Sequence, residues 1–238
     1  MHEKFLEVKE LVKTYNQDRG ILQLYNRLSF SLGRGDFLAV TGRSGWGKST
    51  LANIVLGLES PSLGAIFHND REVTRFGFNK RFSKTRLAII FQRSTMLGEL
   101  SVRKNLNLAL SLSRVPKDEQ STRIDEALEF FGLENYANSM PEGLSAGQRR
   151  RLDLARALAI QPDFLLVDEP VGDLDTSTMN LLLPLLRGIN RDHETTILMM
   201  TALQRVASSA KRQVALNPPV HGVMTMIETQ IPQQSLEA

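Results

Sequence analysis

The stretch Gly42-Arg43-Ser44-Gly45-Trp46-Gly47-Lys48-Ser49-Thr50 fits the pattern G-x-x-x-x-G-K-[ST], which is typical of a phosphate-binding P-loop. The apolar residues 37–41 before it predict a buried strand, and the apolar residues after it recur on one face of a helix. That face consists of Leu51, Ile54, Val55 and Leu58. Because the motif requires a strand before the loop and a helix after it, we predict a working P-loop rather than an accidental glycine-rich turn.

The residue types of this loop suit phosphate chemistry. Its glycines let the backbone turn tightly enough to point N–H groups at phosphate oxygens, and the helix N-terminus favours anions. Lys48 supplies positive charge to the outer phosphates, and the Ser49 hydroxyl can ligate Mg²⁺. The loop therefore predicts a phosphate-bearing ligand bound together with Mg²⁺.

The bulk composition is that of an ordinary globular protein. The 238 residues are enough for one substantial domain or a domain with a lobe, and they are 42% hydrophobic and 23% charged. Without cysteine no disulfide can form, which fits a reducing compartment. No apolar run reaches the roughly 20 residues that span a bilayer, and we expect no signal segment at the N-terminus. The net charge of +3 indicates a nucleic-acid or anionic-membrane partner only weakly.

The rest of the chain alternates between predicted strands and helices. Strands are predicted at residues 6–11, 28–32, 65–68, 87–91, 164–167 and 195–201. Helices are predicted from the Ser101 cap to about residue 112, through residues 124–131 up to Gly132, and from Ser145 to before Pro162. Buried strands separated by helices indicate an α/β fold with a mainly parallel sheet, while the helices without strands between them form a lobe. The tail from Asn217 is expected to fray.

Polar side chains follow two of these strands directly. Gln92 comes after the strand at 87–91, and Asp168 and Glu169 end the strand at 164–167. Parallel α/β sheets bind ligands at the carboxyl ends of their strands, so the amide and the carboxylates are candidates for Mg²⁺ coordination and water activation. An acidic turn with a purely structural role is the alternative.

Two further features have open alternatives on the residues alone. Ser145 and Gln148 fit a capping box at a helix start, which is either a second anion site or only a cap. Tyr15 lies between two predicted strands, where its ring could stack on adenine. On spacing alone a half-buried tyrosine at a strand end is the favoured interpretation.

Taken together, these stretches resemble the ATP-binding subunit of an ABC transporter over about residues 5–215, because several of its motifs occur in the family's order. Residues 42–50 match Walker A, Gln92 the Q-loop, residues 164–169 Walker B, and residues 172–175 the D-loop with Asp175. The signature, usually L-S-G-G-Q, is matched by Leu144, Ser145, Ala146, Gly147 and Gln148. Tyr15 matches the aromatic of the A-loop, and this resemblance makes adenine stacking the better hypothesis.

The resemblance implies a P-loop NTPase of the ABC cassette type: a mainly parallel core at about 1–93 and 161–215, an N-terminal antiparallel region, a helical subdomain at about 94–160 and a tail at about 216–238. It implies ATP and Mg²⁺ as ligands. The implied ATP-binding residues are Tyr15, Arg43, Ser44, Gly45, Trp46, Gly47, Lys48, Ser49, Thr50 and Gln92. The implied catalytic residues are Glu169, Gln92 and Lys48, and the implied metal ligands are Ser49, Gln92 and Asp168.

The resemblance also implies partners and a location. In this family two cassettes, from the same or different chains, sandwich two ATP molecules, with the signature of one facing the Walker motifs of the other. A separate integral membrane permease would dock near Gln92, Met96 and Leu97, placing this cytoplasmic chain peripherally on the cytoplasmic face of the inner membrane. The basic segment at 71–86 is similar to the lipoprotein-releasing, macrolide-export and cell-division branch. No nucleic-acid partner is expected, because ABC ATPases of that class generally carry two cassettes or long insertions.

Three residues depart from the family pattern. Ala146 replaces a signature glycine, a change of one methyl group, and Trp46 stands where a small residue is usual; we interpret its ring as pointing out of the loop toward a partner. Ala202 stands where the family has a histidine that contacts the γ-phosphate, and His193 lies too early in the chain to replace it. We therefore expect a transport ATPase with slow hydrolysis. The alternative is a regulatory ATP switch that acts through a membrane partner without appreciable turnover.

Overall fold

The computed structural model describes residues 4–17, 20–75, 82, 85–170, 176–217 and 226–230. The chain divides into two compact units, one formed by Met1–Lys84 with Arg187–Ala238 and the other by Thr85–Leu186. The segment predicted as a helical subdomain, residues 94–160, lies within the second unit. Among the described residues, no helix is both long and apolar enough to cross a membrane.

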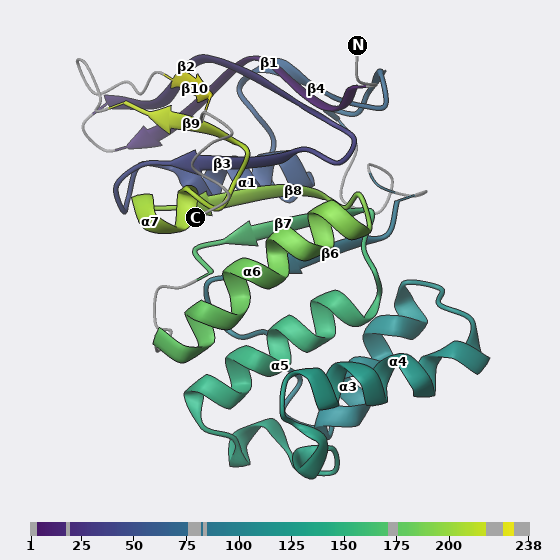
Figure 1. Cartoon of the computed structure of the whole chain (residues 1–238). Helices are drawn as coiled ribbons and strands as arrows, with labels where there is room; N and C mark the ends of the chain where they lie inside the picture. Colours follow the sequence, from purple (N-terminus) through teal and green to yellow (C-terminus); the bar gives the residue numbers. More distant parts are fainter. Residues whose placement is uncertain are drawn as a thin grey trace. The chain divides into compact units, whose positions relative to one another are not determined.

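The first unit contains an antiparallel sheet in the order β2-β1-β4-β5 (Figure 1). Its strands are β1 (Lys4–Gln17), β2 (Gly20–Gly33), β4 (Leu63–His68) and β5 (Arg71–Glu72). Strands β1 and β2 extend well beyond the predicted 6–11 and 28–32, because their pairing continues through register shifts where the apolar alternation fails. One shift lies between Val8 and Leu11, where Glu10 has a φ of 49°. A Cβ at Gly64 would lie 2.5 Å from the Glu10 carbonyl oxygen, so only glycine fits there.

Parallel strands form the other layer of this unit. Strand β3 (Phe37–Thr41) pairs in parallel with β8 (Thr196–Thr201) and β9 (Arg212–Leu216), and helices α1 (Lys48–Leu56) and α7 (Gln204–Ala207) pack beside them. Strand β10 (Met226–Gln230) pairs with β9 in antiparallel register along its whole length. The expectation that the chain frays from residue 217 is therefore wrong for residues 226–230, because β9 offers them backbone hydrogen bonds.

Helix α1 ends two residues before the last residue of its predicted apolar face, Leu58. Leu51, Ile54 and Val55 are fully buried, as expected, but Leu58 is 55% exposed. Gly57 ends the helix with a φ of 77°, and the N–H of Leu58 turns back to bond the carbonyl of Asn53. This glycine C-cap takes Leu58 off the buried face.

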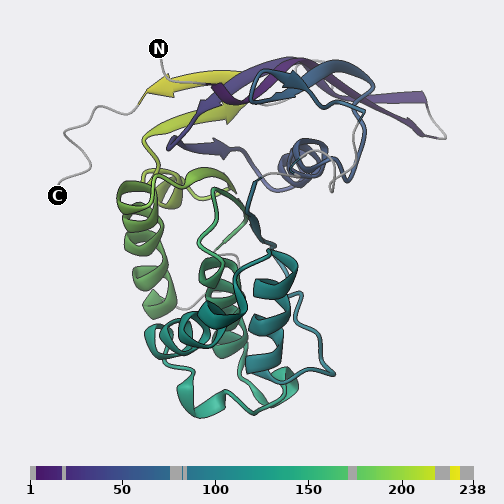
Figure 2. The same ribbon diagram turned by 90° about the vertical axis from the view of Figure 1, so that its right-hand side faces the viewer.

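The second unit holds parallel strands β6 (Leu87–Ile90) and β7 (Phe164–Asp168) and a group of helices that gather together in both views (Figures 1 and 2). These helices are α3 (Val102–Leu112), α4 (Lys117–Phe130) and α5 (Ala146–Ala159), with short 3₁₀ turns at Glu134–Tyr136 and Pro141–Gly143. Ser101 caps α3 as predicted, and Gly132 follows α4 with a φ of 61°. Helix α6 (Thr176–Asp192) begins in this unit and ends in the first.

Candidate functional site

The P-loop wraps around the ammonium group of Lys48. Lys48 begins α1 directly after β3 and the loop, and its Nζ donates to the carbonyls of Gly42 at 2.8 Å and Arg43 at 3.1 Å. The residue is only 4% exposed. The loop thus holds a buried positive charge at the N-terminus of a helix, where the free N–H groups of the first turn also attract anions.

Gly47 is the loop position at which only glycine is possible. Its φ is 83°, and an added Cβ would lie 2.8 Å from both Leu24 Cδ2 and Tyr25 Oη. The Tyr25 hydroxyl donates to the Gly47 carbonyl, and burial raises the pKa of Tyr25 well above its ordinary value, so the phenol stays a donor. Tyr25 is not predicted from the sequence, because a tyrosine inside a strand has no local signal that separates it from an ordinary core residue.

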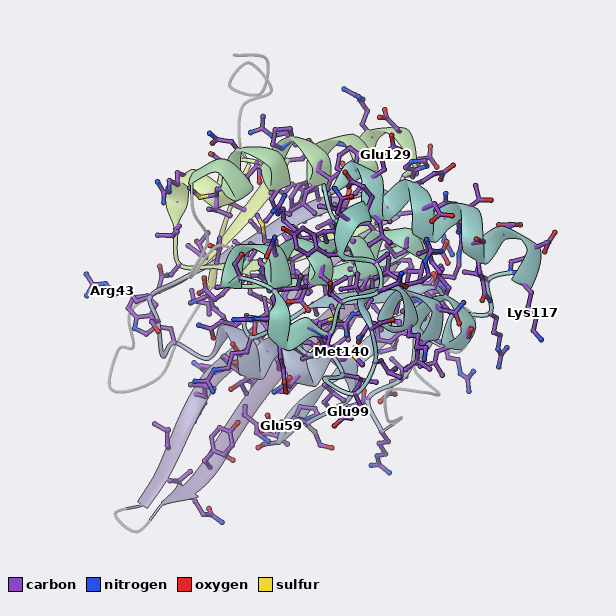
Figure 3. All side chains as sticks on the ribbon, turned by 90° about the horizontal axis from the view of Figure 1, so that it is seen from below. Arg43, Glu59, Glu99, Lys117, Glu129 and Met140 are labelled. Carbon is purple, nitrogen blue, oxygen red and sulfur yellow. The ribbon has the colours of Figure 1, made fainter. Side chains whose placement is uncertain are left out.

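Trp46 and Arg43 lie together on the outside of the loop. The Arg43 guanidinium is 5.9 Å from the ring centroid of Trp46, and Figure 3 shows Arg43 projecting away from the ribbon. Trp46 is half-buried, and its Cε3 would be 3.4 Å from a Cβ on Gly42. The ring therefore lies beside Gly42, where the glycine leaves room for it, and part of it stays exposed. That it points toward a partner stays a prediction.

Tyr15 lies near the first turn of α1. Its hydroxyl donates to Glu59 Oε1 at 2.6 Å, and the Lys13 ammonium sits 4.9 Å from its ring centroid. Burial and the bond to Glu59 raise the pKa of Tyr15, while the hydroxyl of Thr50 acts on it in the opposite direction. The ring is half-buried with Lys13 over one face, and stacking of an adenine on it stays a prediction.

Gln92, Asp168 and Glu169 lie at one edge of the second unit. Ile90 pairs with Val167 in parallel register, so the ends of β6 and β7 meet and bring these three residues to the same edge, as predicted. Asp168 is 7% exposed, and Glu169 has a φ of 46°, a left-handed conformation that costs a non-glycine residue about 1–2 kcal/mol. The amide and the carboxylates thus share an edge at which the backbone is strained.

The predicted capping box at α5 is present in both halves. The Ser145 hydroxyl accepts from the Gln148 N–H at 3.2 Å, and Gln148 Oε1 accepts from the Ser145 N–H at 2.8 Å. Leu144 is buried and Ala146 is exposed. Nothing lies within 4 Å of a Cβ built on Gly147, so packing inside the chain does not require glycine there.

Ala202 follows β8 at its carboxyl end and is exposed. His193 comes before that strand, at its opposite end, so the length of β8 separates the imidazole from the position where the family has its histidine. The D-loop residues 172–175, with Asp175, lie outside the described residues.

The oxygen donors fit Mg²⁺ bound with a phosphate ligand. Within the described part of the chain, no group of three His, Cys, Asp or Glu side chains is placed to hold a metal by itself. Ser49 of the first unit offers a hydroxyl, and Gln92 and Asp168 of the second offer an amide and one carboxylate. Mg²⁺ is usually held by one or two carboxylates together with substrate phosphates and water, so each of these donor types suits it.

The sequence profile of the ABC transporter family matches residues 25–172, which include the P-loop, Gln92, residues 144–148 and Glu169. The chain belongs to the ABC transporter family.

Among curated ABC relatives, the chain is 37% identical over 205 residues to the methionine import ATP-binding protein MetN 2 of Bacillus cereus, covering 86% of this chain and 60% of that protein. It is 35% identical over 212 residues to MetN 1 of Staphylococcus aureus, covering 89% and 62%. The chain thus spans about 60% of the length of these relatives. They are of a different branch from the one that the segment at 71–86 suggested, so that branch prediction has no support.

Solved ABC cassettes share the fold. The dimeric structure of MJ0796, a bacterial ABC transporter cassette, has a TM-score of 0.83 and 27% identity, covering 94% of this chain and 98% of that one. CbiO1 from Clostridium perfringens, part of the CbiONQ transporter complex, has a TM-score of 0.78 and 25% identity, covering 96% and 89%. The predicted P-loop ABC cassette fold is confirmed.

Proposed function

We propose that this chain is the ATP-binding subunit of an ABC importer, which hydrolyses ATP with Mg²⁺ and drives a separate membrane permease. The observation that carries the proposal is the strand–loop–helix in which Lys48 is buried inside a loop made of Gly42, Arg43 and their neighbours. A buried ammonium group among backbone N–H groups and glycines suits a triphosphate. The family match extends this site to ATP.

The residues have distinct proposed roles. Lys48 and the loop residues Arg43, Ser44, Gly45, Trp46, Gly47, Ser49 and Thr50 hold the phosphates, and Tyr15 stacks on the adenine. Glu169 orients and polarises the attacking water. Ser49, Gln92 and Asp168 would hold Mg²⁺, which when bound neutralises charge on the outer phosphates.

A second cassette completes the proposed site. The MJ0796 cassette was solved as a dimer, and a further structure of it holds ADP and phosphate. Ser145 and Gly147 begin a helix whose N-terminus would face the γ-phosphate of ATP bound to the partner. Gly147 supports this role, because the surroundings of the single chain leave space for a side chain there.

The partner in the membrane is a permease, and we place the chain on the cytoplasmic face. The names of the MetN relatives state methionine import, so import is the proposed direction and methionine is the first cargo to test. The exposed Leu97 and its neighbour Met96 follow Gln92 and form the proposed docking surface.

Ala202 favours slow hydrolysis at this chain's own Walker site, since a methyl group cannot donate a hydrogen bond to the γ-phosphate. The same residue supports the second candidate, a regulatory ATP switch that binds ATP and dimerises with little turnover. Single-turnover hydrolysis of the assembled complex separates the two candidates, because a switch would hold ATP without cleaving it.

The proposal is tested by measuring nucleotide affinity of Lys48→Ala. We expect the loss of most ATP·Mg binding, because the buried cation is removed. Lys117→Ala is the matched control, since Lys117 is exposed and projects from the start of α4 (Figure 3). Unchanged affinity of Lys48→Ala would overturn the nucleotide site.

A further inference from the structure

The segment that carries Gln92 is fastened at both ends by arginines of α5. Arg150 Nη1 donates to the Phe91 carbonyl at 2.5 Å, on the residue directly before Gln92. Arg156 donates twice to Thr95. Its Nη1 donates to the Thr95 carbonyl at 2.9 Å, and its Nη2 donates to the Thr95 hydroxyl at 2.6 Å. Residues 91–95 are thus fixed to a single face of the helix that begins at the signature.

Arg150 also holds the backbone beside Glu169. Its Nε and Nη2 donate to the carbonyl of Pro170 at 3.3 and 3.0 Å, and the residue is only 8% exposed. Pro170 directly follows Glu169, whose φ of 46° lies in the left-handed region. Because this backbone is strained, it needs an external support to keep one conformation, and the guanidinium provides it.

An acidic residue stands between the two arginines. Asp153 lies three residues from each of them along α5, so all three share one helix face. Asp153 is 3% exposed, and its Oδ1 is 3.6 Å from Arg156 Nη2. Burial raises the pKa of its carboxyl group, while Ser94, the two arginines and the Thr95 backbone act on it in the opposite direction. Its carboxylate faces the guanidinium groups of the buried Arg150 and the half-buried Arg156, so the opposite charges offset one another.

We propose that Arg150, Asp153 and Arg156 are positioning residues, a charged ridge on α5 that holds Gln92 and Glu169 in place relative to the signature at the start of the same helix. This inference rests on the proposed function, because it gives Gln92 and Glu169 their roles in hydrolysis. A shift of α5 when its N-terminus meets the partner's nucleotide would carry both segments with it.

The geometry of Arg150 requires a guanidinium. One side chain donates in two directions, from Nη1 to Phe91 and from Nε with Nη2 to Pro170. A lysine ammonium is a single point with no fixed fork, so it cannot hold both carbonyls in the same way.

The proposed role of this ridge is tested by two measurements on full-length Arg150→Gln and Arg150→Lys variants. The first is amide hydrogen exchange of residues 91–95 without nucleotide, which we expect to speed up at least about tenfold in both variants as the segment opens more often. The second is ATP turnover. We expect kcat to fall about 10²-fold, the scale of a 1 Å misplacement, with KM within about threefold of wild type.

Arg103→Gln is the matched control, because Arg103 of α3 forms a partly exposed ion pair with Asp125 of α4 in the same unit. Nucleotide affinity is followed by fluorescence of Trp46, the single tryptophan of the chain, which lies in the P-loop. Wild-type exchange and wild-type kcat in both Arg150 variants would overturn the ridge. A parallel loss of affinity and turnover would also overturn it, since that pattern belongs to general destabilisation. Failure of the wild-type chain to bind ATP would instead overturn the proposed function, and the nucleotide-free exchange result would still stand.

Discussion

One buried hydroxyl group, that of Tyr25, supports the backbone of the P-loop. It donates to the carbonyl of Gly47, the residue before Lys48, from a side chain with no exposed surface. Tyr25→Phe leaves that carbonyl without its phenol donor, so we expect the free energy of unfolding to fall by about 1–3 kcal/mol. ATP affinity should fall as well, because the loop loses a support.

Urea denaturation and nucleotide titration of Tyr25→Phe check this prediction. Tyr136→Phe is the control, since no hydrogen bond of the Tyr136 hydroxyl is found in the structure's described part. An equal effect of the two substitutions would contradict a special role for Tyr25.

A second prediction at this scale concerns Ala202. Catalysis of phosphoryl transfer consists largely of positioning and electrostatic stabilisation, and removing one preorganised donor typically costs about 10²–10³-fold in rate. We therefore expect slow single-turnover hydrolysis by the wild type and a faster rate in Ala202→His, with ATP affinity largely unchanged. A fast wild-type rate that Ala202→His leaves unchanged would mean that another group replaces the histidine.

At the scale of the element, the first turn of helix α5 contains a glycine, Gly147, that packing within the chain does not require. Gly147 lies in the first turn, and a Cβ there would meet nothing within 4 Å. Glycine in a helix costs up to about 1 kcal/mol relative to alanine, so Gly147→Ala should stabilise the isolated chain by up to that amount. The added methyl group should weaken ATP-dependent dimerisation, because it would stand between the helix N-terminus and the partner's ATP.

Thermal unfolding and sizing with ATP measure the two effects. Both are best compared in a Glu169→Gln background, which we expect to trap the ATP-bound dimer. If Gly147→Ala dimerises as well as its parent, the signature does not face a nucleotide across an interface.

The helices illustrate how well local signals work at this scale. The caps of α3 and α5 were predicted at Ser101 and Ser145, where both are found, because a cap is a contact within four residues. The end of α1 was missed, because apolar spacing continued to Leu58 while Gly57 had already turned the chain.

At the scale of the whole molecule, the proposed assembly needs a surface for the permease. Leu97 is 44% exposed, and it lies with Met96 on the segment that follows Gln92. We expect the double substitution Met96→Asp and Leu97→Asp to release the permease while leaving ATP affinity unchanged, since charges there would oppose burial of the surface.

Co-purification of the permease with tagged chain measures this effect. Leu112→Asp is the matched control, because Leu112 is 75% exposed at the end of α3. Retention of the permease by the double variant would place the docking surface elsewhere.

The sequence by itself determined the P-loop between its strand and helix, the polar residues at the ends of β6 and β7, and the capping box at Ser145. Each is a short-range pattern, set by side-chain period or by a motif of a few residues. The family resemblance then linked these patterns into one fold, which the structural neighbours confirm.

Only the tertiary structure decided which residues support the P-loop and the segment that carries Gln92. Tyr25 meets Gly47 from 22 residues away, Arg150 meets Phe91 from 59, and Arg156 meets Thr95 from 61. Strand β10 likewise pairs with β9 through backbone hydrogen bonds, and the sequence of β10 did not predict a strand there. Contacts between such distant residues produce no period and no local motif, so they become visible only when the chain is folded.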